Sequence, residues 1–222
     1  MERHFEKELE NLKTAIIKMG SIVEEAIALS IRSLEEKDTE LSRRVIDNDG
    51  RINSMEIEID NAIVDILALQ QPVATDLRTI LAAQIINTDL ERIGDHAVNI
   101  AESALTLAST RLEGLMLELP EMVEITTLML RNALDSFIHQ DPDLAARVLA
   151  QDDSVDDLNR QMTKEVVTLM EQDPEAIRGG LELIRVSRNL ERVADLTTNI
   201  AEEVIFLARA KVVKHRAQGP SE

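Results

Sequence analysis

The chain has 222 residues, a formal net charge of −18, no Cys, no Trp and no Tyr. The negative charge repels nucleic-acid phosphates and few aromatic rings are available for base stacking, so nucleic acid is not an expected partner. Without Cys there are no disulfides, thiolate metal sites or cysteine nucleophile. No stretch approaches about 18 uncharged apolar residues, so direct insertion into a membrane is not expected either.

The composition is 44% hydrophobic but only 1% aromatic, which favours an all-α protein with an aliphatic core. Breaks in the helical periodicity predict six long helices. The first runs from about Arg3 to Glu36, and the second runs from about Thr39 to Gln70 with Asp38 suited to cap it. Pro72 suits the first turn of a third helix, which continues to about Ala108.

The second half of the chain begins after Ser109–Leu119, a short and partly apolar segment that we interpret as a junction. The fourth helix extends from about Pro120 to Gln140. Asp141-Pro142 is typical of a helix start, with Asp as the N-cap and Pro as the first helical residue. Asp173-Pro174 repeats this pattern and predicts a sixth helix that reaches about Lys214.

One segment occurs in both halves. Leu90–Glu102 reads LERIGDHAVNIAE, and Leu190–Glu202 reads LERVADLTTNIAE, with eight of thirteen positions identical at an offset of one hundred residues. A chain with the same segment in each half is expected to contain two copies of one unit. We therefore predict a first three-helix bundle over residues 1–108, a junction over 109–119, and a second bundle over 120–222 that ends in a short tail.

Helix geometry divides each copy of the segment into two faces. At about 100° per residue, Leu90, Ile93, Ala97 and Ile100 form one apolar stripe, and the equivalent residues of the second copy repeat it. The opposite face carries oxygen atoms from Glu91, Asp95, Asn99 and Glu102, and from Glu191, Asp195, Asn199 and Glu202. Like charges four residues apart destabilise a helix by about a few tenths of a kcal/mol, so a binding partner that offsets the repulsion is a reasonable hypothesis.

The second helix of each half contributes further oxygen-bearing residues beside its apolar line. These residues are Asp49, Asn53, Glu56 and Asp60 in the first half, with Asp152 and Asp156 matching Asp49 and Asn53 at an offset of 103. If the second and third helices are adjacent, both sets could share one shallow surface site. Carboxylates without Cys suit hard or borderline cations such as Mg²⁺, Ca²⁺, Mn²⁺ or iron. A solvated acidic helix face is the alternative, and these residues alone leave both readings open.

Other kinds of site find less support. Oxidative di-metal carboxylate enzymes use Glu-x-x-His with ligands that point into the core, whereas Gly94 and Ala194 occupy the positions three residues after the motif Glu. His96 lies near the core edge and is interpreted as structural. The chain contains no GxxxxGK[ST] loop, GxGxxG motif or GxSxG elbow, and no catalytic residues are predicted.

Four arginines occupy equivalent positions in the two halves. Arg92 and Arg192 each precede an acid by three residues, so we expect surface ion pairs with Asp95 and Asp195. Arg78 and Arg178 lie early in the third and sixth helices, where contact with an anion such as phosphate stays an open alternative.

The paired motifs, the opening FEKELENLKTAIIKMGSIVEEAI and the segment VIDNDGRINSMEIEID together resemble the PhoU family of phosphate-signalling proteins. The resemblance spans nearly the whole chain. It implies two similar three-helix bundles side by side, with metal ions, often iron or zinc in clusters, on the ExxxD surfaces; manganese and magnesium also suit such ligands. The candidate metal ligands are therefore Glu91, Asp95, Asn99, Glu191, Asp195, Asn199, Asp49, Asp152, Asp156, Glu56 and Asp60.

The same resemblance implies a role and partners. Family members are cytoplasmic, often dimeric, and act without catalysis as negative regulators of phosphate uptake and of the phosphate-starvation response. They link a phosphate ABC transporter to a membrane sensor histidine kinase and are thus held at the membrane through these partners. The alternatives are a metal-binding helical regulator of another transporter and a metal-free helical interaction module.

The two copies are not equal at the candidate sites. Glu56 corresponds to Asn159, and Asp60 corresponds to Thr163. The first half thus offers more carboxylates, and the sequence predicts that the two sites differ in metal occupancy or metal count.

Overall fold

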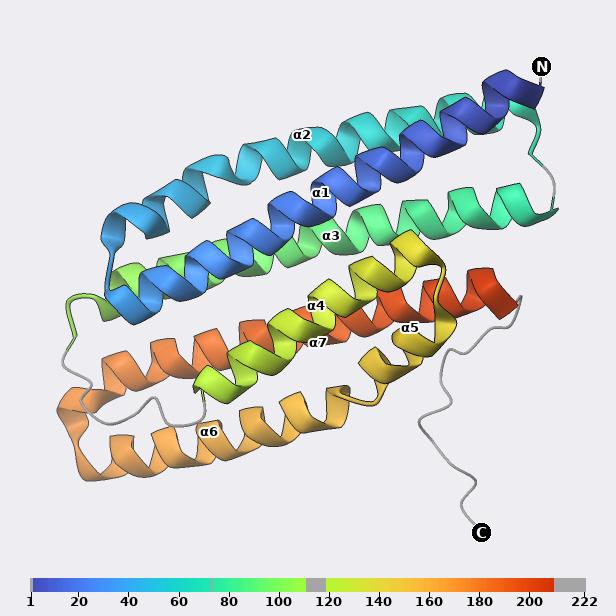
Figure 1. Ribbon diagram of the computed structural model, residues 1–222. Coiled ribbons are helices and arrows are strands. Elements are labelled where there is room, and N and C mark those ends of the chain that lie inside the picture. Colours follow the sequence, from blue (N-terminus) through green and yellow to red (C-terminus); the bar gives the residue numbers. More distant parts are fainter. Residues whose placement is uncertain (1, 73, 111–118, 210–222) are drawn as a thin grey trace, which may run out of the picture.

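A computed structural model describes residues 2–72, 74–110 and 119–209 of the chain. Every regular element in these ranges is helical, which confirms the predicted all-α class (Figure 1). None of the described helices is long and apolar enough to cross a membrane. The elements are α1 (Glu2–Glu36), α2 (Thr39–Gln70), α3 (Ala74–Leu107), α4 (Leu119–His139), α5 (Pro142–Leu149), α6 (Asp152–Gln172), the 3₁₀ turn η1 (Pro174–Ala176) and α7 (Ile177–Arg209).

The first bundle consists of α1, α2 and α3, which pack against one another in pairs. Asp38 caps α2, because its side chain accepts hydrogen bonds from the backbone N–H groups of Glu40 and Leu41. The left-handed conformation of Lys37, with φ 52°, reverses the chain between α1 and α2. Helix α3 begins at Ala74, so Pro72 precedes the helix and does not form its first turn.

In the second bundle, α4 corresponds to α1 and α7 to α3, but the predicted fifth helix is divided into α5 and α6. The division lies at Ala150 and Gln151, where the Gln151 N–H bonds to Val148 O at 3.0 Å in a tighter 3₁₀-type turn. Asp152 and Asp153 therefore begin a new helix, whose N-terminal dipole favours their negative charge. The predicted caps Asp141 and Asp173 both accept backbone hydrogen bonds at the starts of α5 and η1.

The predicted apolar stripe forms the centre of the core. Leu90, Ile93, Ala97 and Ile100 are fully buried, as are their repeat equivalents Leu190, Val193, Thr197 and Ile200. Buried apolar residues of both halves belong to one continuous cluster. Most of the predicted junction, residues 111–118, lies outside the described residues, as do the end of the predicted sixth helix and the tail.

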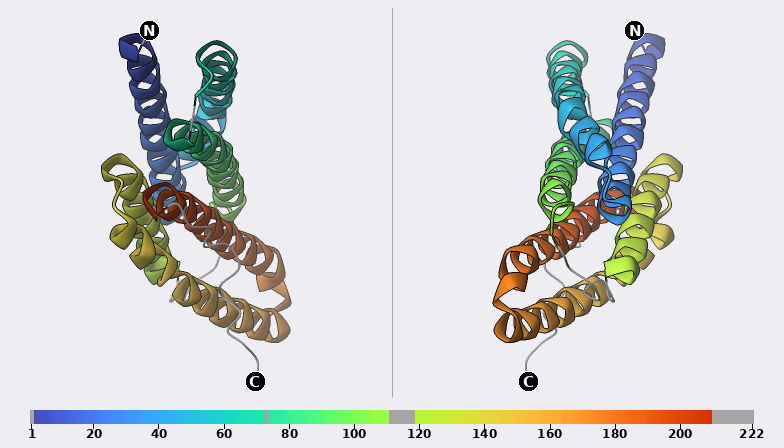
Figure 2. Two further views of the ribbon diagram at one scale, coloured as in Figure 1. Left: turned by 90° about the vertical axis from the view of Figure 1, so that its right-hand side faces the viewer. Right: turned by 90° about the vertical axis from the view of Figure 1, so that its left-hand side faces the viewer.

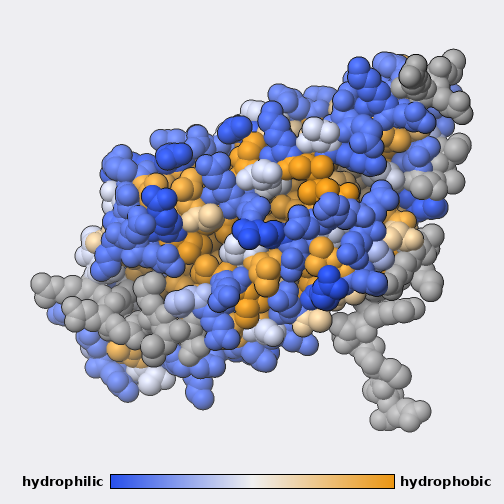
Figure 3. All heavy atoms as spheres, in the orientation of Figure 1, coloured by the Kyte–Doolittle hydropathy of each residue, from blue (hydrophilic) through white to orange (hydrophobic). Residues whose placement is uncertain are grey.

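Helices α3 and α7 lie side by side and antiparallel, and they join the two bundles (Figures 1 and 2). Helices α1 and α4 form a second contact between the bundles, where Arg131 Nε lies 2.9 Å from Glu24 Oε1. Hydrophilic residues cover most of the face shown in Figure 3, while apolar side chains gather along its middle, over α1 and α4. The motif residues of both halves therefore lie on the two helices, α3 and α7, that form the interface between the bundles.

Candidate functional site

The motif acids of α3 lie opposite acids of α2. Burial raises the pKa of Glu91, and the negative charges of Asp95, Glu56 and Asp49 raise it further, while Arg92 lowers it. Burial and then Asp49 raise the pKa of Asp95, against a smaller lowering by His96. The structure thus brings Glu91, Asp95, Glu56 and Asp49 into one cluster of mutually repelling carboxylates.

Gly94 allows this close approach. A Cβ atom on Gly94 would lie 2.8 Å from Ile52 Cδ1 of α2, much closer than an ordinary van der Waals contact. Gly94 and Asp49 also line one small cavity of about 30 Å³ between the helices. Because the glycine sits between Glu91 and Asp95, α2 packs closely on α3 at the level of the motif acids.

Two buried oxygens at this cluster lack a hydrogen-bond partner within the described part of the chain. Asp49 Oδ2 accepts a hydrogen bond from Asn53 Nδ2 at 2.9 Å, but Asp49 Oδ1 is buried and unpaired, and so is Asn53 Oδ1. An unpaired buried acceptor costs free energy. Oxygen atoms of this kind, next to several carboxylates, fit the ligand preference of a hard cation.

The second bundle repeats the cluster with Asp152 at its centre. Burial raises the pKa of Asp152 to about 6, with further contributions from Asp195, Asp156, Asp153 and Glu191. Burial also raises the pKa of Glu191, with Asp195 as the next cause. The first residue of α6 thus lies near the motif acids of α7, the arrangement expected if these two helices are adjacent.

The two clusters differ in their positive partners. Arg192 Nη1 donates to Asp195 Oδ2 at 3.0 Å, which confirms the expected ion pair, and this contact opposes the effect of burial on the pKa of Asp195. In the first half the corresponding prediction is wrong, because Arg92 forms its ion pair with Asp89, at 4.0 Å, and not with Asp95. In addition, Arg160 Nη1 lies 3.6 Å from Asp156 Oδ2. Arg192 and Arg160 therefore form ion pairs with acids of the second cluster, whereas the ion pair of Arg92 is with Asp89, outside the first cluster.

The positions where the repeats differ in sequence also differ in contacts. Burial raises the pKa of Glu56, with Asp60 and Asp95 as further causes. Asp60 Oδ1 accepts hydrogen bonds from Gln84 and Asn87, both at 2.8 Å, so amides already satisfy it. At the position equivalent to Glu56, Asn159 accepts a hydrogen bond from Ser187 Oγ. Hydroxyl and amide groups in the second half thus take the place of carboxylates in the first.

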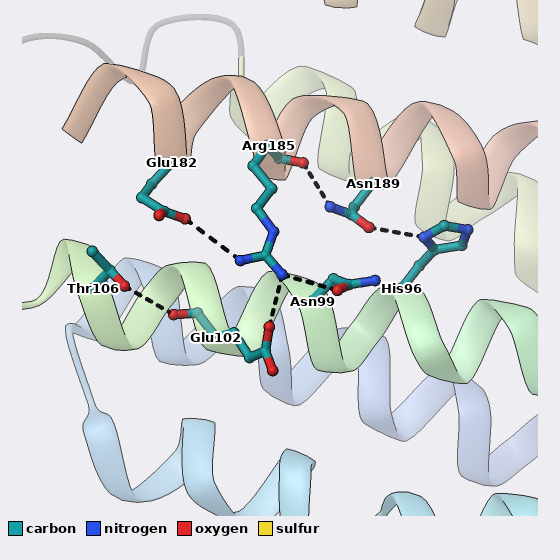
Figure 4. Close-up of polar contacts among 7 residues, drawn as sticks. All are labelled: His96, Asn99, Glu102, Thr106, Glu182, Arg185 and Asn189. Atoms are coloured by element: carbon teal, nitrogen blue, oxygen red, sulfur yellow. Dashed lines mark hydrogen bonds and ion pairs between the residues drawn. The ribbon is translucent and has the colours of Figure 1, made fainter. Parts of the chain in front are cut away.

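The motif asparagines lie elsewhere. Asn99 Oδ1 accepts a hydrogen bond from Arg185 Nη2 of α7 at 3.0 Å, and the same guanidinium lies 2.7 Å from Glu102 Oε2 (Figure 4). Asn99 therefore takes part in the contact between the bundles, away from α2. Asn199 is exposed and lines a pocket with Arg192. Asn99 thus contacts Arg185 of the other bundle, while Asn199 lines this pocket together with the motif acid Asp195.

His96 has a structural contact, in agreement with the expectation. Its Nδ1 lies 2.8 Å from Asn189 Oδ1, and Asn189 Nδ2 donates to Arg185 O (Figure 4). Because the amide donor of Asn189 is used, its oxygen is the acceptor and His96 Nδ1 carries the proton. Sequence reasoning missed Arg185 and Asn189. Their equivalents are Ile85 and Asp89, so the repeat held no signal for them.

No group of three or more His, Cys, Asp or Glu in the described ranges is arranged so that it could hold a metal ion as it stands. The residues nevertheless fit a cation in their chemistry. Each cluster contains only oxygen donors, and burial together with neighbouring negative charges raises the pKa of Glu91 in the first cluster and of Asp152 in the second. A metal ion would require side-chain rotation to bring these oxygens together.

Comparison with known proteins matches the chain to the PhoU domain twice, over residues 16–104 and 119–204. A PhoU homolog of Aquifex aeolicus, a phosphate-specific transport system accessory protein, is 40% identical over 210 residues, which cover 95% of each protein. The Serratia marcescens protein PhoU is 35% identical over 95% of this chain and 87% of its own length. The crystal structure of PhoU from Pseudomonas aeruginosa superimposes with a TM-score of 0.90 at 38% identity, covering 93% of this chain and all of that one. PhoU from Streptococcus pneumoniae, a phosphate transport system regulatory protein, gives a TM-score of 0.88 at 29% identity. The chain therefore belongs to the PhoU family.

Proposed function

We propose that this chain is a regulatory accessory of phosphate transport, and that it acts as a negative regulator of phosphate uptake and of the phosphate-starvation response. The observation that carries this proposal is the similarity along nearly the full length to proteins named as phosphate-specific transport system accessory proteins. In this role the chain is a non-catalytic adaptor between a phosphate ABC transporter and a sensor histidine kinase.

The proposal includes metal binding by both acid clusters. Glu91 and Asp95, with Asp49 and Glu56 from α2, would hold metal in the first bundle. Glu191 and Asp195, with Asp152 and Asp156 from α6, would hold metal in the second. A bound ion supplies positive charge that offsets the repulsion among these carboxylates and links α2 to α3, or α6 to α7. Iron or zinc is expected from the family, and the all-oxygen donor sets also suit manganese or magnesium.

Docking to partners follows from the charge. With a net charge of −18, the chain is expected to approach basic patches on its partners, whose attraction increases the rate of association. The proposed location is the cytoplasmic side of the membrane, reached through those partners, and the proposed assembly is a homodimer. A metal-free interaction module remains the alternative, and so does regulation of another transporter.

A genetic complementation experiment tests the function. In cells that lack this chain, a reporter of the phosphate-starvation response should be active even in high phosphate, and the wild-type gene should repress it again. A parallel affinity purification from membranes at high and low phosphate should recover the transporter and the kinase. If the reporter stays repressed at high phosphate without the chain, the proposed negative regulation is wrong. Recovery of another transporter alone would favour the alternative.

Metal dependence is tested in the same cells. A variant with Glu91→Ala, Asp95→Ala, Glu191→Ala and Asp195→Ala should lose repression while its protein level stays normal. Full repression by this variant would reject a role of metal in signalling, and the adaptor function would then belong to a metal-free module.

A further inference from the structure

The contacts between α3 and α7 define an antiparallel register. His96 meets Asn189, Asn99 meets Arg185, and Glu102 meets the same arginine one turn further on (Figure 4). Contacts closer to the C-terminus of α3 therefore involve residues closer to the N-terminus of α7. Continued in the other direction, this register brings position 92 level with position 192. Because Arg92 and Arg192 occupy equivalent positions in the repeat, this is the level at which residues of α3 lie beside their own repeat equivalents in α7.

A pocket lies at this level of the interface between α3 and α7. It has a volume of about 340 Å³, and its lining includes Arg92 and His96 from α3 with Arg192, Asp195 and Asn199 from α7. Two arginines therefore line one pocket in a strongly acidic protein. This volume is at the lower end of the range of small-molecule sites, about 300–1,000 Å³.

The arginines at the interface between α3 and α7 differ in the acidic side chains that form ion pairs with them. Arg185 lies 2.7 Å from Glu102 Oε2 and 3.9 Å from Glu182 Oε2, and it also donates to Asn99 (Figure 4). Arg92 has one ion pair among the described residues, the 4.0 Å contact with Asp89, and its side chain is 60% exposed. Like charges that share one pocket repel each other, so a negative group between Arg92 and Arg192 would be stabilised by both.

We propose that this pocket binds a small tetrahedral oxyanion of the phosphate class between Arg92 and Arg192. A guanidinium presents its N–H donors in a planar fork that matches the oxygens of such an anion, and charge-assisted hydrogen bonds of this kind are strong. Asn199 adds an amide donor at the pocket wall. The hydrogen bond from His96 to Asn189, which is itself held by Arg185 O, fixes one side of the pocket.

Asp195 competes with the anion for Arg192. Its carboxylate lines the pocket and accepts a hydrogen bond from Arg192 at 3.0 Å. Since a guanidinium has five N–H donors, Arg192 can serve Asp195 and an oxyanion together. The negative charge of Asp195 must still weaken anion binding, and this gives the proposal a test in which a substitution increases affinity. Arg78 and Arg178, the positions left open in the sequence, lie about four helical turns from this level and take no part.

The experiment is isothermal titration calorimetry of the full, metal-stripped chain with inorganic phosphate, in a buffer that contains no other oxyanion. Wild-type protein should bind one phosphate per chain. Arg92→Gln and Arg192→Gln should each weaken binding about tenfold or more, the loss expected for a charged hydrogen bond. Arg43→Gln is the matched control, because Arg43 is 61% exposed and lies on α2, so that its loss changes the net charge equally. Asp195→Asn should tighten binding.

Sulfate and phenyl phosphate serve as further probes. Phosphate bound in preference to both identifies free phosphate as the ligand, while tighter binding of phenyl phosphate identifies a phosphoryl group on a larger molecule. Circular dichroism establishes that each variant retains its helix content. The proposal is overturned if no saturable oxyanion binding occurs, or if Arg43→Gln weakens binding as much as the two pocket substitutions do. It is also overturned if Asp195→Asn weakens binding.

Discussion

Replacement of Asp152 by Asn should stabilise the metal-free protein at neutral pH. Asp152 has its pKa raised from 3.8 to about 6, with burial as the largest cause and four neighbouring carboxylates adding to it. The folded chain therefore holds this proton more tightly than the unfolded chain. Between about pH 4 and pH 6 the unfolded state releases the proton first, so stability falls as the pH rises through this window.

The magnitude follows from the shift. At about 1.36 kcal/mol per unit, a rise from 3.8 to about 6 corresponds to about 3 kcal/mol at full weight. Asp152 is only partly buried, so solvent screening reduces this to about 1–2 kcal/mol. The substitution also removes the favourable interaction of the Asp152 carboxylate with the α6 dipole, which lowers the gain in stability by about 0.3–1 kcal/mol. The net stabilisation expected for Asp152→Asn at pH 7.5 is thus about 0.5–1.5 kcal/mol.

Urea unfolding followed by circular dichroism measures this effect at pH 4 and pH 7.5, after metal has been removed. The variant should be more stable than wild type at pH 7.5 and should lose that advantage at pH 4, where Asp152 is protonated in the folded protein. With metal added at pH 7.5, the order should reverse, because Asp152 is then a proposed ligand and a bound ligand stabilises the folded state. A variant that is less stable than wild type in metal-free buffer at pH 7.5, or an effect that does not change with pH, would refute the reasoning.

Three further predictions concern the metal, the packing and the partners. The variant that lacks Glu91, Asp95, Glu191 and Asp195 should contain less metal by elemental analysis yet stay folded, since these acids lie outside the core. If the variant and the wild-type protein contain equal metal and are stabilised equally by it, the acids form only a solvated surface. Gly94→Val should destabilise the first bundle by about 1–3 kcal/mol, because its side chain would overlap Ile52, and an unchanged urea midpoint would show that α2 adapts freely. Binding to the transporter or kinase should weaken between low and high salt, and salt-independent affinity in surface plasmon resonance would exclude electrostatic docking.

Local signals in the sequence were enough to predict most of the secondary structure. Asp38, Asp141 and Asp173 each cap the element that follows them, because a cap depends on hydrogen bonds to backbone groups only two or three residues away. The buried stripe of α3 and α7 was equally predictable, since helical spacing alone decides which residues share a face. The break between α5 and α6 had no such signal. Ala150 and Gln151 are compatible with a continuous helix, and neither Gly nor Pro marks the interruption.

The two copies of one unit, with acids at equivalent positions, could also be recognised from the sequence, because a repeat is visible at any distance along the chain. Which of these residues are in contact depends instead on the packing of the two bundles. An offset of one hundred residues relates Arg92 to Arg192 but says nothing about the direction in which α3 packs on α7. The antiparallel register turns Asn99 toward Arg185, gives His96 a partner in Asn189, and places both motif arginines at one pocket. These contacts join residues more than eighty positions apart, and their geometry depends on how the two bundles pack, which no local pattern encodes.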